Sequence, residues 1–277
     1  MFQQIIVPLD GSPEAAEALG PASAMARRVG APMHVIALHS PGHDATELEQ
    51  TVLAQADTTG DVVRIVEVRP IEVDVATDLI RLTTRSGPAL IVMATHARGR
   101  SAAVFGSVAA DVLAVAGQPV MLIGPNVLRS SFRTHGPAIV AVDGHEDSEV
   151  LSLTATLLAD TDFHPVVANV VDPREAKQLA ANRGGPGGFD LPNETAVAHR
   201  AAEHLRTSSD LDSVDYDVFH DEHPGDAIVA QANERRASLI VMTTHARRGL
   251  DRLTTGSVAA EVVRDAPCPV LVAGLDA

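Results

Sequence analysis

The stretch LIVMTTHARRGLDRLTTGS, residues 239–257, begins as an apolar run and ends in a Gly-Ser pair that can open a helix. A short apolar run bounded by turn residues is typical of a parallel strand that is buried on both faces. Nearly the same pattern, LIVMATHARGRSAAVFGS, occupies residues 90–107. The chain therefore uses one strand–loop–helix unit twice, and this duplication guides the interpretation of the rest of the sequence.

The duplication extends along most of the chain. IIVPLDGSPEAAEA at 5–18 aligns with AIVAVDGHEDSEVL at 138–151, at an offset of 133 residues, whereas the stretches at 90 and 239 are offset by 149 residues. The second repeat therefore gains 16 residues between the two matches. The expected place of this insertion is the region 172–194, and its Gly- and Pro-rich segment 182–194 is either a flexible loop or a lid or partner-binding loop. We expect two domains and a linker, at residues 1–125, 136–277 and 126–135 respectively.

Each repeat alternates apolar runs with amphipathic segments, which is typical of an α/β fold with right-handed crossovers. In the first repeat the expected strands are 4–9, 33–39, 62–68, 89–94 and 119–123, and the expected helices are 13–29, 45–57, 72–86 and 107–116. Ser12 and Pro13 are suited to begin the first of these helices. The sequence thus predicts two tandem Rossmann-like domains, each with a doubly wound, five-stranded parallel sheet.

The composition limits the classes of function. The net charge of −15 disfavours binding to nucleic acid, and Lys177 is the only lysine. The single cysteine, Cys268, excludes an internal disulfide and fits a reducing compartment. No apolar run reaches about 18 residues and no signal segment is evident, so we expect a cytoplasmic protein that does not enter a membrane.

Ligands of doubly wound sheets bind at the carboxyl ends of the strands. Asp10 and Asp143 follow the first strand of each repeat, where a carboxylate can accept hydrogen bonds from ribose hydroxyls or can cap the next helix. Gly106-Ser107 and Gly256-Ser257 open helices, where free amides suit an anion, although the serine can also be an ordinary N-cap. No G-x-x-x-x-G-K-[ST] or G-x-G-x-x-G motif is present, which excludes a Walker-type site and disfavours a dinucleotide site.

The segments VPLDGSPEA, HPGDAI and LIVMTTHARRGL with TTGSVAAEVVRDAPCPVLV resemble the universal stress protein family, and the resemblance covers nearly the whole chain twice. It implies an adenine-nucleotide-binding domain, dimeric through its last strand, that acts in stress adaptation and is not a dedicated catalyst. ATP-binding members carry G-x-x-G, nine residues and G-[ST]. Here the second repeat has Thr243-x-x-Ala246 with the nine-residue spacing. The first has Ala94-x-x-Ala97 with eight residues, so we expect the second repeat to be the better site.

The resemblance implies a ligand set for ATP, with or without Mg²⁺. In the second repeat Asp143 would hold the ribose, Val170 and Met242 the base, and the loop with its helix start the phosphates. The loop and helix residues are Thr243, His245, Ala246, Arg247, Gly256, Ser257 and Val258. The counterparts in the first repeat are Asp10, Met93, His96, Arg98, Gly106, Ser107 and Val108. We also expect the two domains to pair within the chain and the chain to form a homodimer.

Two alternatives remain open. A non-nucleotide interaction module would explain the missing glycines and the shorter first loop. A slow ATPase would need a positioned base, and no acid or nucleophile recurs near His96 and His245, so we predict no catalytic residues. HDEHPGD at 220–226 could bind a metal, but nothing equivalent occurs in the first repeat and we predict no metal site.

Overall fold

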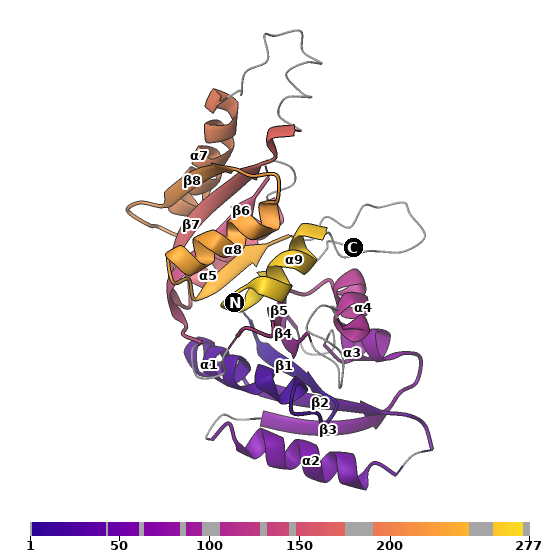
Figure 1. Ribbon diagram of the computed structural model, residues 1–277. Helices are drawn as coiled ribbons and strands as arrows, with labels where there is room; N and C mark the ends of the chain where they lie inside the picture. Colours follow the sequence, from indigo (N-terminus) through magenta and orange to yellow (C-terminus); the bar gives the residue numbers. More distant parts are fainter. Residues whose placement is uncertain are drawn as a thin grey trace.

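The computed structural model describes residues 2–42, 44–60, 64–83, 87–95, 106–127, 132–143, 148–174, 191–243 and 257–273. Within these residues ten strands form one continuous sheet in the order β3-β2-β1-β4-β5-β10-β9-β6-β7-β8 (Figure 1). The first repeat supplies β1(Gln4–Leu9), η1(Ala15–Ala18), α1(Leu19–Val29), β2(Met33–His39), α2(Thr46–Asp57), β3(Arg64–Pro70), α3(Val75–Thr83), β4(Ala89–Ala94), α4(Ser107–Val115) and β5(Val120–Ile123). The second supplies β6(His135–Val142), α5(Ser148–Leu158), β7(Asp162–Val171), α7(Leu191–Ser208), β8(Asp215–His220), α8(Pro224–Glu234), β9(Leu239–Met242), α9(Ser257–Asp265) and β10(Val270–Val272).

Each repeat is a doubly wound parallel sheet, as the alternation of apolar and amphipathic segments predicts. In the first repeat β1 pairs with β2 on one side and with β4 on the other, both in parallel. In the second repeat β6 pairs in the same way with β7 and β9. The predicted fold class is therefore confirmed, and each repeat has its switch point beside its first strand.

The two repeats share one sheet because their last strands pair with each other. β5 and β10 are antiparallel, with Leu271 opposite Met121. The equivalent residues Val120 and Val270 lie on either side of this pair, so a local twofold axis passes close to it. The sequence predicted two sheets that pair within the chain, and the structure shows that the pairing is a continuous hydrogen-bonded ladder.

Two apolar layers cover the two faces of the ten-stranded sheet. One layer packs η1, α1, α2, α5 and α7 against strand residues such as Val7 and Val140. The other packs α3, α4, α8 and α9 against residues such as Ile6 and Ile139. Each layer contains residues of both repeats, so the apolar core is continuous across the joint.

The helix expected over 13–29 is divided into the 3₁₀ helix η1 and the α-helix α1. Pro21 explains the division, because a proline has no N–H to donate and is accommodated only in the first turn of an α-helix. Starting the α-helix at Leu19 places Pro21 in that first turn. The Ser12 hydroxyl still caps the segment, because it accepts a hydrogen bond from the Ala15 N–H at 3.1 Å.

Candidate functional site

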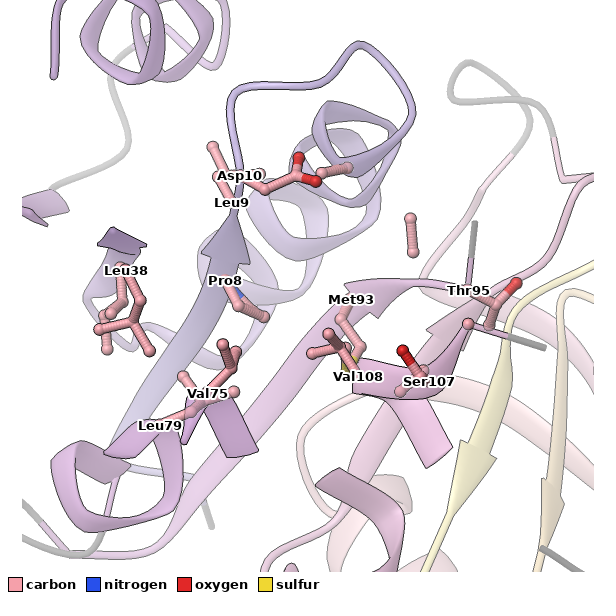
Figure 2. Close-up of a pocket in the computed structure, with 15 residues that line it drawn as sticks. Pro8, Leu9, Asp10, Leu38, Val75, Leu79, Met93, Thr95, Ser107 and Val108 are labelled. Carbon is pink, nitrogen blue, oxygen red and sulfur yellow. The ribbon is translucent and has the colours of Figure 1, made fainter. Parts of the chain in front are cut away.

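A pocket opens at the carboxyl edge of the first repeat, where β1 and β4 lie side by side. The chain runs outward from β1 through β2 to β3 and returns to β4 on the other side, so this is the switch point of the sheet. The pocket has a cavity volume of about 180 Å³. Figure 2 shows its walls, which come from the ends of β1, β2 and β4, from α3 and from the first turn of α4.

One side of the pocket is apolar. Leu38 of β2, Val75 and Leu79 of α3, and Met93 of β4 face the cavity, and Val108 of α4 closes it at the other end (Figure 2). Leu79 and Met93 are buried, whereas Val108 is 39% exposed. An apolar surface of this kind can hold a heterocyclic base by burying its faces.

Asp10 supplies a carboxylate to the rim of the pocket. Its Oδ1 accepts hydrogen bonds from the Ser12 N–H at 2.9 Å and from the Ser12 hydroxyl at 2.5 Å. Asp10 therefore has the structural role considered from the sequence, since it orients the hydroxyl that caps η1. Its other oxygen, Oδ2, has no hydrogen bond within the described part of the chain and remains able to accept one from a ligand.

The two ends of the first-repeat loop are held together beside the pocket. The Gly106 N–H donates to the Thr95 carbonyl oxygen at 2.9 Å, and the Thr95 N–H donates to the Ile123 carbonyl oxygen at 3.1 Å. A Cβ atom added at Gly106 would lie 2.9 Å from the Thr95 carbonyl oxygen, which is too close for an ordinary contact. Glycine is therefore needed at 106 so that the loop can close at its base.

Ser107 begins α4 at the wall of the pocket, and its side chain is exposed. No described side chain caps this helix. The amides of Ser107, Val108 and Ala109 precede the first intrahelical hydrogen bond, which the Ala110 N–H donates to the Gly106 carbonyl oxygen at 3.0 Å. Free amides and the positive end of the helix dipole both favour an anion at this point.

The structure brings together five of the residues predicted for the first repeat, Asp10, Met93, Gly106, Ser107 and Val108. His96 and Arg98 lie outside the described residues. In the second repeat Asp143 is exposed after β6, Val170 and Thr243 are half-buried, and Met242 is buried at the end of β9. Ser257 and Val258 begin α9, whereas His245, Ala246, Arg247 and Gly256 lie outside the described residues. That the second repeat is the better site therefore stays a prediction.

Sequence reasoning missed Leu38, although it selected the equivalent residue in the second repeat. Val142 pairs with Asn169 and Leu9 pairs with Ala37, so Leu38 occupies the same place as Val170. Strand register could have identified it from the alignment of Asp10 with Asp143. Val75 and Leu79 were also missed, because their only sequence signal is the amphipathic pattern of α3, which any packed helix shows.

The described residues offer no metal centre, since no group of three His, Cys, Asp or Glu side chains converges within them. In the 220–226 segment, Asp221 accepts a hydrogen bond from the His223 N–H at 2.8 Å, and Glu222 lies 3.4 Å from the Arg174 guanidinium. None of the helices in the described part of the chain combines the length and the apolar character needed to cross a membrane.

Comparisons with known proteins agree with this architecture. A family model described as the universal stress protein family matches residues 1–124 and again 136–274. A universal stress protein of Methanocaldococcus jannaschii is 49% identical over 49 residues, which are 18% of this chain and 29% of that protein's length.

Two solved structures resemble the whole chain. A universal stress protein from Archaeoglobus fulgidus superposes with a TM-score of 0.68 at 19% identity, covering 98% of this chain and 96% of the other. A protein of unknown function from Pseudomonas aeruginosa PAO1 superposes with a TM-score of 0.67 at 18% identity, covering 99% and 93%. At these identities the structural likeness shows the fold alone.

Proposed function

Because the chain belongs to the universal stress protein family, we propose that it binds an adenine nucleotide, ATP, at the carboxyl edge of the sheet and acts as a stress-response regulator. The observation that carries the proposal is the pocket of the first repeat. It joins an apolar wall, a carboxylate and the uncapped start of a helix around one cavity at the switch point (Figure 2). These three features match the base, the ribose and the phosphates of a nucleotide.

Each part of the pocket has an assigned role in this proposal. Leu38, Val75 and Met93 pack against the adenine, and Asp10 accepts a hydrogen bond from a ribose hydroxyl through Oδ2. The phosphates lie at the first turn of α4, beside Ser107 and Gly106, with His96 and Arg98 of the adjoining loop as further donors. The second repeat binds through the equivalent set that begins with Asp143, Val170 and Met242. A bound Mg²⁺ would be held by the phosphates.

The protein's other properties follow from the same proposal. A nucleotide-dependent regulator needs a change in shape or surface on binding, and it does not need a catalytic base. We propose that the chain works in the cytoplasm and assembles as a homodimer, and that any ATP hydrolysis is slow. Neither nucleic acid nor membrane is a proposed partner.

Calorimetric titration of the full chain with ATP tests the proposal, together with the variants Ser107→Glu and Ser107→Gln. A glutamate at the start of α4 is compatible with the helix dipole, so the fold is retained, but its charge lies where the phosphates bind. Two like charges about 5 Å apart repel by about 3 kcal/mol at an effective dielectric of about 20, which weakens binding about 100-fold. Glutamine has the same size without the charge, so Ser107→Gln should bind ATP nearly as the native chain does.

The stoichiometry and the variants decide between the alternatives. One or two nucleotides per chain support the proposal, and loss of one of them in Ser107→Glu alone places it in the first repeat. No heat of binding at millimolar ATP would exclude the nucleotide function and favour an interaction module that keeps only the fold. Equal binding by Ser107→Glu and the native chain would exclude phosphate binding at α4.

A further inference from the structure

A second pocket lies at the amino edge of the sheet in the second repeat, opposite to the edge where the nucleotide is proposed to bind. Its cavity volume is about 240 Å³. It is lined by the residues that precede three parallel strands: Arg133 before β6, Ser238 before β9 and Cys268 before β10. The end of α8 contributes Asn233 and the turn after it contributes Arg236.

The two repeats differ at this edge in a specific way. The strand registers show which residues of the two repeats correspond. Ile5 pairs with Leu90 in the first repeat, and Ala138 pairs with Leu239 in the second. In the same way Val120 pairs with Ile91 in the first repeat, and Val270 pairs with Ile240 in the second. Three positions of the first repeat, Gln3, Gly87 and Gln118, therefore correspond to Gly136, Arg236 and Cys268 of the second.

In the first repeat the two glutamines occupy this edge. The Gln118 Oε1 accepts a hydrogen bond from the Ala89 N–H at 2.9 Å. The Gln3 amide lies against Gly87, so closely that a Cβ atom there would collide with its Oε1. In the second repeat the smaller residues Gly136 and Cys268 replace these glutamines. The Cys268 side chain, which lines the cavity, does not extend as far as Gln118 does and leaves space at this edge.

The rim of this cavity is positively charged. Arg133 and Arg236 both line it and both are exposed. Neither guanidinium has an ion-pair or hydrogen-bond partner within the part of the chain that the structure describes. Arg236 also has a φ of 51°, a left-handed conformation that disfavours a residue with a Cβ, where the first repeat has Gly87. Two unpaired arginines are an unexpected feature at one pocket of a chain whose net charge is −15.

Ser238 adds a polar group beside the cavity. The residue lines the pocket and is only 4% exposed, and its Oγ is buried without a hydrogen-bond partner among the described residues. A buried hydroxyl without a partner is costly, and rotation of the side chain would let it donate to a ligand oxygen in the cavity. Burial raises the pKa of the Cys268 thiol to about 12, so the neighbouring sulfur carries no negative charge that would repel an anion.

We propose that this pocket binds a small oxyanion, a phosphate or carboxylate group, held by the guanidinium groups of Arg133 and Arg236 and by the Ser238 hydroxyl. Guanidinium groups suit both anions because they donate paired hydrogen bonds to two oxygens. The polar groups that line the cavity supply donors for one anionic group, so the proposed ligand is a small oxyanion. This site is independent of the proposed nucleotide pocket.

The test is calorimetric titration of the full chain with inorganic phosphate and, separately, with acetate, at constant ionic strength. We expect one of the two to bind with a dissociation constant of about 1 mM or lower. Phosphate binding alone identifies a phosphate site, and acetate binding alone identifies a carboxylate site. If the native chain binds neither anion, the proposal is overturned.

Four variants locate the bound anion. Loss of one charge-assisted contact should weaken binding about tenfold, so Arg133→Gln with Arg236→Gln should weaken it about 100-fold. Arg200→Gln removes the same charge from an exposed position on α7 and should leave binding unchanged. Cys268→Gln refills the pocket as Gln118 does in the first repeat and should abolish binding while circular dichroism shows a retained fold. Ser107→Glu should still bind the anion. Native affinity in the double arginine variant would overturn the proposal whether or not ATP binds.

Discussion

Gly124 lies at the joint between the two repeats, where an added methyl group would meet the backbone of the other repeat. It follows β5 in the first repeat, and a Cβ atom added there would collide with the Val263 carbonyl oxygen of α9 in the second repeat. Beside it, the Asn126 amide donates to the Arg264 and Asp265 carbonyl oxygens at 3.3 and 3.4 Å. The end of the first repeat and the start of the linker thus cover the carboxyl end of a helix of the second repeat.

We expect Gly124→Ala to destabilise the chain by about 2–4 kcal/mol. Both colliding atoms belong to the backbone or are attached directly to it, so no side-chain rotation can separate them, and α9 must move away from β5. Overpacking of this kind costs about 1–3 kcal/mol. The movement also lengthens the two Asn126 hydrogen bonds, each worth about 0.5–1.5 kcal/mol. For a chain of this size the thermal midpoint should fall by roughly 5–10 °C.

Urea unfolding followed by circular dichroism measures this effect, with Gly30→Ala as the matched control. Gly30 ends α1 with a φ of 68° and has no atom within 4 Å of an added Cβ. Its substitution therefore introduces only backbone strain, worth about 1 kcal/mol. If Gly124→Ala is no less stable than Gly30→Ala, the close approach of β5 and α9 is not a constraint on the joint and the reasoning is wrong.

Three further outcomes are expected. Gly106→Ala should weaken ATP binding about tenfold in calorimetry, because the added methyl lies 2.9 Å from the Thr95 carbonyl oxygen and opens the base of the loop; an unchanged affinity would contradict this. Cys268 should react with iodoacetamide at pH 8 about 1,000-fold more slowly in the native chain than in urea, because burial raises its pKa from 9.0 to about 12. Equal alkylation rates in the two states would argue against burial of the thiol. Since the pKa of the thiol is higher in the folded than in the unfolded state, the free energy of unfolding should also fall as the pH rises from 9 towards 12. Arg28→Ala should lower the free energy of unfolding in urea by less than about 1 kcal/mol, because the side chains of Arg28 and its partner Asp162 are 38% and 66% exposed. A larger loss would show that this inter-repeat ion pair is not screened by solvent.

The sequence predicted the fold class because the apolar runs of the strands are strong local signals. Runs such as IIVPL and LIVM read as buried parallel strands wherever they occur, and their duplication defined the two repeats. The division of the helix expected over 13–29 depends on Pro21, whose missing N–H leaves no trace in the apolar periodicity that predicts one helix. The predicted domain bounds remain predictions, as do the second-repeat loop residues.

The parts of the site that could not be predicted depend on register and on empty space. Leu38 enters the pocket only because Leu9 pairs with Ala37, and the sequence does not state that pairing. The amino-edge pocket depends on the size of side chains, since Gly136 and Cys268 stand where the first repeat has glutamines. Neither residue belongs to a sequence motif, and their effect becomes visible only when the two repeats are compared in space.

Fusion of two repeats in one chain explains why the repeats differ at the amino edge of the sheet while their last strands, at its centre, remain similar. At the joint, Met121 faces Leu271 and the flanking pairs are Val120 with Val272 and Leu122 with Val270. A change on either strand must fit its partner across the local twofold, so similar apolar residues are required on both. At the amino and carboxyl edges the described residues of one repeat do not face their own counterparts in the other, so each repeat can change alone. Two identical subunits could not do this, because every substitution would appear in both. The fusion therefore permits an open amino-edge pocket in one repeat and a glutamine-filled edge in the other.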